Sequence, residues 1–330
     1  MLPEWSAVRA VLLAWPYAEG DWSESYQRIS ACYAGILRTL CEHIETWVLV
    51  HPSCKQDFDR YSANVNQNNL KVFEQAYNDT WIRDYGPLSL PGKLCNFQFD
   101  GWGKKYDSDL DNAAVNKIFE NTASGVMPLL SCSQLVVEGG ALEINDDGIL
   151  LANKDCLFDR NRNPSHDETA VREELQEQLN IKDFALVENV CLSGDDTDGH
   201  IDTLARFASN DQVLYCGSDG EHPDHLALQS LETQLQDLAK KYSWELTALP
   251  TPVIYEGDKL LAASYANFLI CNDCVFVPAY DVIEDERVEK IFKRVFPKSK
   301  ILMLPCLPLL SQNGSLHCAT MQVATAAWGA

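Results

Sequence analysis

The stretch Leu142-Glu143-Ile144-Asn145-Asp146-Asp147-Gly148-Ile149-Leu150-Leu151 consists of two short apolar segments around a polar turn. Asn, Asp and Gly tolerate the positive φ angles of a tight turn, so this stretch predicts a β-hairpin. The same pattern recurs around Pro91-Gly92, Asn210-Asp211 and Asn272-Asp273. The turns lie near residues 92, 147, 211 and 273, and are therefore 55, 64 and 62 residues apart.

Helical patterns alternate with these hairpins. Apolar residues recur at helical spacing in segments 22–42, 111–121, 165–179, 224–242 and 284–296. Ser165 is a predicted N-cap residue ahead of Glu168. The chain thus divides into five hairpin-plus-helix units of about 66 residues, and closing them in a ring would hide their strand edges. We expect one α/β domain over residues 1–330.

Composition narrows the class of protein. The chain has 330 residues, 46% of them hydrophobic, and 48 acidic against 26 basic side chains, for a net charge of −22. Such a surface repels nucleic acid and anionic membranes and attracts cations, although many acidic proteins use their charge for no particular partner. No apolar run approaches the ~20 residues of a membrane span, and no signal-peptide pattern opens the chain. We expect a cytoplasmic protein, with a homodimer as the default assembly.

The twelve cysteines are predicted to be small buried residues rather than disulfide partners, which agrees with a reducing compartment. Six of them lie in apolar segments: Cys32, Cys41, Cys95, Cys156, Cys191 and Cys216. Cys271 and Cys274 are spaced like half of a zinc site, but no second pair follows nearby. Because Asn272-Asp273 between them reads as a turn, we expect no metal.

Polar residues suited to catalysis follow the same period as the hairpins. Asp84, Glu138, His200, Asn267 and Cys318 are 54, 62, 67 and 51 residues apart. Each precedes or begins a predicted hairpin or final strand of its unit. Equivalent positions of a closed ring converge on its axis, so this spacing predicts one shared pocket.

These residue types suit attack on the carbon of a guanidinium group. Its delocalised charge makes that carbon a poor electrophile, so carboxylates must hold the plane while a nucleophile attacks perpendicular to it. We assign Asp84 and Asp202 to the clamp and Cys318 to the attack. His200 would protonate the leaving amine and then activate water. Glu138 would orient His200 or touch the substrate, and His200 and Asp202 would share one face of a strand.

Each of these residues also has a simpler interpretation. A lone cysteine is most often inert packing, a lone histidine a satisfied polar group, and Arg83-Asp84 a surface pair. The register of the whole set with the repeat favours a site. Carboxylates near Cys318 should raise the pKa of its thiol, and either the imidazolium of His200 or a bound cation would offset this.

Seven motifs occur in order along nearly the whole chain: Leu13-Ala14-Trp15-Pro16, Asn78-Asp79-Thr80-Trp81-Ile82-Arg83-Asp84, Val137-Glu138-Gly139-Gly140, Asn161-Arg162-Asn163-Pro164, Asp198-Gly199-His200-Ile201-Asp202, Ser264-Tyr265-Ala266-Asn267-Phe268 and Leu316-His317-Cys318. Together they resemble the agmatine deiminases of the Porphyromonas-type peptidylarginine deiminase family. The resemblance implies the pentein fold, a five-bladed α/β propeller of pseudo-fivefold symmetry with short mixed sheets around a central site. It also implies hydrolysis of agmatine to N-carbamoylputrescine and ammonia without metal or cofactor.

The resemblance further implies roles for matched positions. Cys318 is the nucleophile that forms a thiouronium intermediate, and His200 is the acid and base. Trp81 lines the substrate channel, and Asn267 is assigned to substrate binding with it. Asp196 stands where the family usually carries a glutamate that meets the far amine of the substrate, which favours agmatine over arginine.

Alternatives remain within and outside this chemistry. The segment Ser311-Gln312-Asn313-Gly314-Ser315 has fewer glycines than the family usually carries there, which leaves the guanidine substrate open. Arginine or peptidyl-arginine deimination and amidino transfer are the other enzymatic readings. A ring that only binds cationic ligands or partners, with an incidental cysteine, is the non-enzymatic one.

Overall fold

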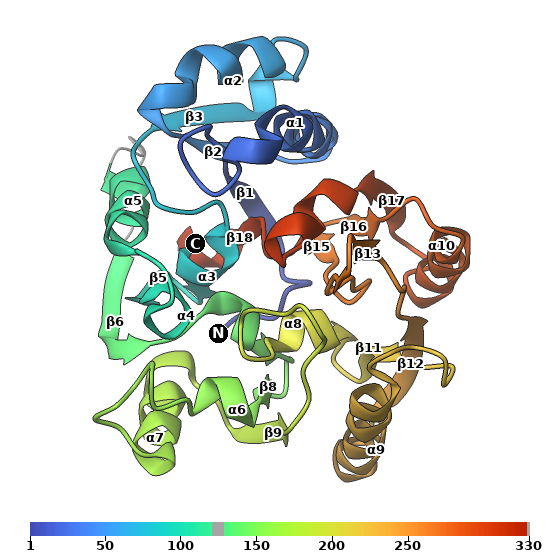
Figure 1. Cartoon of the computed structure of the whole chain (residues 1–330). Coiled ribbons are helices and arrows are strands. Elements are labelled where there is room, and N and C mark those ends of the chain that lie inside the picture. Colours follow the sequence, from blue (N-terminus) through green and yellow to red (C-terminus); the bar gives the residue numbers. More distant parts are fainter. Residues whose placement is uncertain (121–128, 329–330) are drawn as a thin grey trace.

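The structure, a computed structural model, describes residues 1–120 and 129–328. Within these residues the strands form one four-stranded sheet, four three-stranded sheets and one two-stranded sheet. Figure 1 shows the five larger sheets and their helices arranged around a common centre. The fold is therefore a mixed α/β fold of short sheets, as the sequence predicts.

Four of the sheets share one plan. In the sheet that contains the opening stretch, β7 (Glu143–Ile144) pairs antiparallel with β8 (Ile149–Asn153). Helix α7 (Glu168–Leu179) follows, and β9 (Asp183–Val187) then pairs parallel with β8. The other three sheets repeat it with β4 (Leu88–Leu90), β5 (Lys93–Gln98), α5 (Asp109–Glu120) and β6 (Leu129–Val136); β10 (Ala205–Ser209), β11 (Gln212–Gly217), α9 (His225–Tyr242) and β12 (Glu245–Pro250); and β15 (Leu269–Cys271), β16 (Cys274–Ala279), α10 (Glu284–Val295) and β17 (Lys300–Pro305).

The remaining sheet joins segments from both ends of the sequence. Strand β18 (Thr320–Ala324) pairs antiparallel with β1 (Val8–Ala14), and β1 pairs parallel with β2 (Thr46–Val50) across α1 (Tyr26–His43). Strand β18 thus takes the place that the first hairpin strand has in the other sheets. A further strand, β3 (Leu70–Glu74), follows α2 (Lys55–Tyr61) and extends the sheet. The turn ahead of β18 is consequently equivalent to the turns ahead of β4, β7, β10 and β15.

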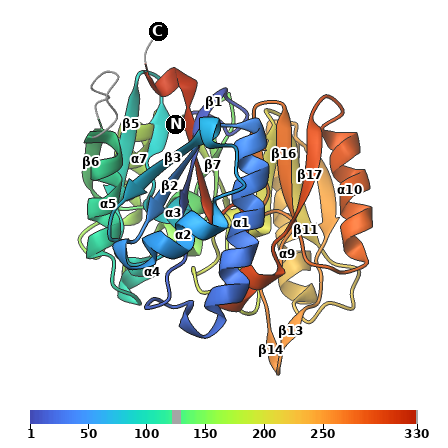
Figure 2. The same ribbon diagram turned by 90° about the horizontal axis from the view of Figure 1, so that it is seen from above.

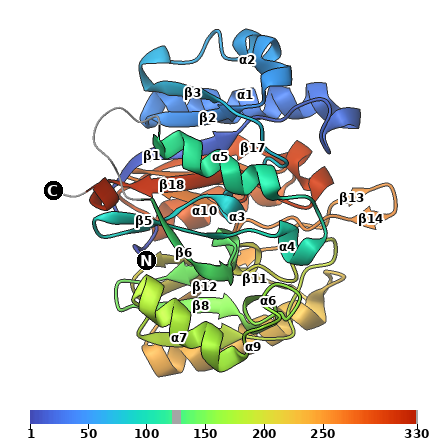
Figure 3. The same ribbon diagram turned by 90° about the vertical axis from the view of Figure 1, so that its left-hand side faces the viewer.

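Short elements fill these turns and the surface. They are α3 (Ile82–Tyr85), α4 (Gly101–Lys104), α6 (Lys154–Leu157), α8 (Ile201–Leu204), β13 (Tyr255–Glu256), β14 (Lys259–Leu260) and the 3-10 turns η1 (Ser23–Ser25), η2 (Pro52–Cys54), η3 (Gln67–Asn69), η4 (Gly139–Ala141), η5 (Leu307–Gln312) and η6 (Thr325–Trp328). The turned views show the β13–β14 hairpin projecting beyond the larger sheets (Figures 2 and 3). No helix of the described residues is long and apolar enough to cross a membrane.

The core follows from the apolar patterning of strands and helices. All residues of β2 are buried, as expected for a strand covered on both faces. Helix α1 buries Ile29, Tyr33, Leu37 and Leu40 on one stripe, at the spacing that predicted it. Each such side chain contributes about 1.5–3 kcal/mol on burial, so many small gains fix the relative positions of the sheets.

The four predicted hairpins are confirmed, and the helices differ mainly at their ends. Helix α1 begins at Tyr26, four residues later than predicted, after η1. The predicted end at residue 121 lies outside the described residues. The predicted Ser165 cap is wrong: the Asp167 side chain accepts the Ala170 N–H at 2.9 Å, because Asp167 directly precedes the first helical residue of α7.

Two further predictions are corrected. His200 and Asp202 do not lie on a strand, since α8 begins at Ile201 and Asp202 is helical. The expectation of free, buried cysteines fails at Cys95, which is disulfide-bonded, and at Cys191, which is exposed. Apolar neighbours in the sequence do not determine which cysteines form a disulfide or lie at the surface. Asn272, with φ 54°, confirms the turn between Cys271 and Cys274.

Candidate active site

The turns ahead of the first strand of each sheet deliver polar side chains to the centre of the molecule. Asp84 lies in α3, Glu138 directly precedes η4, and His200 directly precedes α8. Asn267 precedes β15, and Cys318 precedes β18. All five are buried, and the contacts below join them in one cluster.

Gly140 lets three of these units approach each other. A Cβ atom on Gly140 would lie 2.6 Å from Nδ1 of His200 and 2.8 Å from Oδ1 of Asp84, closer than real Cβ contacts. Its backbone N–H also donates to Asp84 Oδ1 at 2.9 Å. A glycine is thus required here, because any side chain would push the histidine and the carboxylate apart.

His200 lies between two carboxylates. Its Nε2 is 3.2 Å from Oε2 of Glu138, and its Nδ1 is 3.6 Å from Oδ1 of Asp84. Burial alone would lower the pKa of His200, but Asp84, Cys156 and Glu138 outweigh it and raise the pKa well above its usual value. The imidazolium form is therefore favoured at neutral pH, which suits a general acid.

A buried arginine holds Glu138 in place. Nε of Arg162 donates to both Glu138 oxygens, at 2.8 and 2.9 Å, and both side chains are almost fully buried. Arg162 also pairs with Asp159 at 2.9 Å and Asp198 at 2.8 Å. Burial would raise the pKa of Glu138, but His200 and Arg162 hold it below its usual value. Glu138 is consequently an anion fixed against the histidine.

Cys318 lies among hydrogen-bonding groups rather than in an inert apolar pocket. Its Sγ is 3.6 Å from Oδ2 of Asp202 and accepts the side-chain N–H of Asn267 at 3.2 Å. Burial, followed by the Asp202 and Asp84 carboxylates, raises the pKa of the thiol well above its usual value. The thiol form is thus favoured until a cation enters the site, in agreement with the expectation from the sequence.

The two clamp carboxylates differ in their free acceptors. Asp84 accepts from Gly140 through Oδ1 and from the indole N–H of Trp102 through Oδ2 at 3.0 Å. Burial and the neighbouring carboxylates raise its pKa to about 6. Asp202 has His317 Nδ1 2.8 Å from Oδ2, whereas its buried Oδ1 has no partner among the described residues. That oxygen is ready to accept a planar cationic donor.

A cavity leads from Cys318 and Asp84 toward the surface, and it is strongly acidic. Trp81 lines it, as do Asp196 and two further acids, Asp21 and Asp79. Trp22, Trp102, Tyr106, Thr197, Gln312, Asn313 and Gly314 complete the wall. Four carboxylates and three indole rings around one channel suit a slender cationic ligand.

The outer part of this cavity is shaped by Asp196 and the loop before Cys318. Tyr106 donates its hydroxyl to Oδ2 of Asp196 at 2.6 Å, and Lys105 Nζ lies 3.4 Å from Oδ1. Gly314 packs on the Trp81 ring, where a Cβ atom would come within 2.5 Å of the indole. The segment 311–315 has only one glycine, Gly314, and the channel wall requires a glycine at this position.

Sequence reasoning missed Arg162, Trp102 and His317 as members of the cluster. Arg162 lies in one of the seven motifs but has no role assigned from the sequence, and Gly101-Trp102-Gly103-Lys104 matches no motif used in the sequence analysis. In the structure Gly101 has φ 72°, and a Cβ atom there would meet the Tyr106 carbonyl at 2.1 Å. A tryptophan between two glycines, as in Gly101-Trp102-Gly103, could have predicted a tight turn that exposes the indole N–H to the site.

Two clusters among the described residues bring three metal-type ligand atoms together. They are Glu138 with Cys156 and His200, and Glu4 with Glu143 and His317. In the first, Arg162 pairs with Glu138; in the second, Arg206 pairs with both glutamates. Arginine thus already supplies the positive charge that a metal would bring.

Comparison with known proteins identifies the family of this chain. The sequence profile of the Porphyromonas-type peptidyl-arginine deiminases matches residues 1–324. The chain belongs to this family. An agmatine deiminase from Pseudomonas syringae pv. tomato is 27% identical over 98% of this chain and 94% of its own length.

Solved structures of similar proteins agree with the fold. A C. jejuni agmatine deiminase with a cysteine-to-serine substitution and substrate bound is 32% identical, with a TM-score of 0.89 over 97% of this chain and 95% of that one. DDAH from Pseudomonas aeruginosa, a cysteine-to-serine mutant in complex with citrulline, is 13% identical over 96% of this chain and all of that one, with a TM-score of 0.52. The latter likeness concerns the fold alone.

Proposed function

We propose that the protein is an agmatine deiminase, which hydrolyses agmatine to N-carbamoylputrescine and ammonia. The observation that carries this proposal is the position of Cys318 Sγ, 3.6 Å from Oδ2 of Asp202, at the inner end of the acidic channel. The family and the agmatine deiminases similar to this chain support the same reaction. A small cationic guanidine is then the partner that the site binds.

The guanidinium group would lie between Asp84 and Asp202, with the unpartnered Oδ1 of Asp202 accepting one of its N–H groups. Paired carboxylates fix the plane of a guanidinium and leave its carbon open to Cys318. Trp81 would cover the aliphatic chain, and Asp196 would meet the far amine. Asn267 would hold the sulfur in line through its hydrogen bond.

The first half of the reaction forms the thiouronium intermediate. Binding of the cation lowers the pKa of the Cys318 thiol, and the thiol proton leaves to solvent. The thiolate attacks the guanidinium carbon to form a C–S bond and a neutral tetrahedral adduct. His200 then donates its proton to one amino nitrogen, the C–N bond breaks and ammonia leaves.

The second half returns the enzyme to its starting state. Neutral His200 takes a proton from water as the water oxygen attacks the thiouronium carbon. The C–S bond breaks with the electron pair on sulfur, and the hydroxyl proton of the product passes to that sulfur. Glu138 stabilises the imidazolium that reforms, which is the role its 3.2 Å contact supports.

The test is to offer purified protein agmatine, arginine and a peptide ending in arginine, and to measure the ureido product and ammonia. Turnover of agmatine that Cys318→Ala and His200→Ala remove would support the proposal. Amidino transfer would give ornithine-type or amine products without ureido groups. Agmatine turnover in either variant would contradict it.

Free arginine is the second candidate, because one observation favours it. Lys105 Nζ lies 3.4 Å from Oδ1 of Asp196, which lines the channel, and also pairs with Asp198. An ammonium there can pair with the carboxylate that arginine has and agmatine lacks. The ratio of kcat/KM for the two substrates separates them, and the three other wall acids favour agmatine.

We also propose that residues 1–330 form one five-bladed propeller of the pentein type. The plan shared by four sheets and the β18–β1 pairing support this arrangement. A cytoplasmic homodimer that binds neither nucleic acid nor membranes is the expected form of the protein. Sedimentation velocity of the purified chain tests the dimer.

A further inference from the structure

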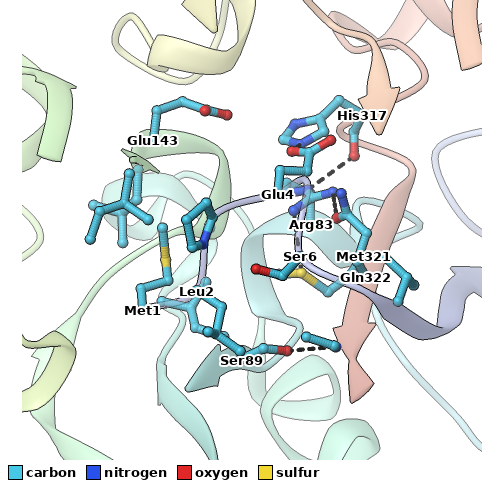
Figure 4. A pocket seen from close by; sticks show the side chains of 17 residues that line it. Met1, Leu2, Glu4, Ser6, Arg83, Ser89, Glu143, His317, Met321 and Gln322 are labelled. Carbon is cyan, nitrogen blue, oxygen red and sulfur yellow. Dashed lines mark hydrogen bonds and ion pairs between the residues drawn. The ribbon is translucent and has the colours of Figure 1, made fainter. Parts of the chain in front are cut away.

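A second cluster of charged residues lies directly behind Asp202, on the side away from the substrate channel. It borders a cavity whose wall includes Glu4, Arg83, Glu143 and His317. Figure 4 shows Glu4 on the N-terminal segment, with its carboxylate beside the ring of His317. None of these four residues lines the channel that leads to Cys318.

His317 connects this cluster to the active site. Its Nδ1 is 2.8 Å from Oδ2 of Asp202, and its Nε2 is 2.9 Å from Oε2 of Glu4. The side chains of His317 and Asp202 are each 1% exposed, so water does not compete for the contact between them. The result is a continuous chain from Glu4 through His317 to the carboxylate that lies beside the cysteine.

The protonation of His317 depends on two arginines as well as on the two carboxylates. A neutral imidazole has a single N–H, yet both ring nitrogens of His317 face carboxylate oxygens. A neutral ring therefore donates to only one of the two carboxylates. Burial, followed by Arg206 and Arg83, lowers the pKa of His317 despite Glu4 and Asp202, so the two arginines supply the positive charge beside these carboxylates.

Glu4 is itself held rigidly. Its Oε1 accepts the backbone N–H of Ile270 at 2.7 Å, and its Oε2 also accepts from Nη2 of Arg206. Arg206 is fully buried, donates to Glu143 and Phe268, and has its guanidinium over the Phe268 ring at 4.8 Å. Contacts from two separate sheets thus fix the far end of the chain.

We propose that Glu4 and His317 are positioning residues that hold Asp202 by its Oδ2 oxygen, so that Oδ1 points at the guanidinium of the substrate. This inference rests on the proposed function, because it assigns Asp202 to the guanidinium. Without the contacts from Glu4 through His317, the Asp202 carboxylate would rotate or turn toward Cys318 and lose its fixed geometry. A carboxylate held through a second residue binds a planar cation with less loss of freedom.

Glu4→Gln tests the inference, and Glu143→Gln is the matched control. Both glutamates pair with the buried Arg206, Glu143 from a buried and Glu4 from a half-buried position, but only Glu4 contacts His317. In a Cys318→Ser background, Glu4→Gln should weaken agmatine binding by about tenfold, whereas Glu143→Gln should change it by less than about threefold. With Cys318 intact, the Glu4 variant should raise KM more than it lowers kcat.

A structural role alone predicts a different pattern. If Glu4 served only to neutralise Arg206, both variants would lower the melting temperature and weaken binding alike, and the inference would be overturned. His317→Asn should reproduce the Glu4→Gln effect, because asparagine cannot contact both carboxylates. Agmatine binding without agmatine turnover in the enzyme with Cys318 would count against the proposed reaction and not against the positioning role.

Discussion

Nε2 of His200 lies 3.2 Å from Oε2 of Glu138, and neither side chain is more than 1% exposed. An ion pair in so dry a place keeps its strength and couples the protonation of the two groups. The glutamate therefore raises the pH at which the histidine loses its proton. In the proposed reaction that determines the pH range in which ammonia can leave.

Glu138→Gln should shift the alkaline limb of the kcat profile to lower pH. The carboxylate raises the pKa of His200, so the neutral amide removes part of that rise and the imidazolium loses its proton earlier. Steady-state turnover of agmatine across pH 6–10 checks this shift. An alkaline limb identical to that of the unsubstituted enzyme would remove Glu138 from control of the acid.

Asp79→Asn should make stability less dependent on pH. Burial raises the pKa of Asp79 from 3.8 to about 7, so between these values the folded protein holds a proton that the unfolded chain releases. The contribution of Asp79 to the free energy of unfolding is therefore largest below about pH 4 and is lost as the pH rises through about 7.

The asparagine variant lacks this fall and should melt higher than its parent at pH 8 but not at pH 4. The upper limit of the gain in free energy of unfolding is about 4 kcal/mol. The actual gain is smaller than this limit, because the channel admits water to Asp79. Thermal melts at both values provide the measurement, with the exposed Asp258→Asn as control. Parallel pH profiles for variant and parent would contradict the account.

Asp196→Asn should raise KM for agmatine while kcat changes little. Asp196 lines the channel with a side chain that is 37% exposed, whereas Cys318 is buried, so we expect its contact with an amine to be equal in ground and transition states. Tyr106→Phe removes the hydroxyl that holds Asp196 and should give a smaller rise in KM. An unchanged KM in the asparagine variant would exclude Asp196 from amine binding.

Trp102→Phe should lower kcat/KM for agmatine by roughly tenfold, because a hydrogen bond to a charged group contributes about 1.5–3 kcal/mol. The indole N–H donates to Asp84 Oδ2, and phenylalanine keeps the ring but not the donor. Trp47→Phe is the control, since its N–H donates to Glu45 away from the cluster. Equal losses in both variants would mean that packing alone is responsible.

The sequence predicted those features that depend on local patterns. The hairpin around residues 145–148 carries its own turn residues, and the period of Asp84, Glu138, His200, Asn267 and Cys318 follows from the repeated plan. The error at His200 and Asp202 arose because a two-residue spacing fits one face of a strand, whereas the chain turns helical after His200.

Partners from distant segments could not be found in this way. Arg162 reaches Glu138 from 24 residues away, and Glu4 reaches His317 from 313 residues away. No local period encodes either contact, because each arises only when the sheets come together around the centre. Buried polar side chains with complete sets of partners are visible in the fold and not in the sequence.

The most direct test of the central claim is to mix enzyme and agmatine, quench with acid within milliseconds, and measure the intact mass of the protein. The account predicts a transient species heavier by the mass of agmatine less ammonia, localised to Cys318 by peptide mapping. It should be absent in Cys318→Ala, and it should form more slowly in His200→Ala because His200 protonates the leaving amine. Agmatine turnover with no such adduct, or with Cys318 replaced by alanine, would contradict the account.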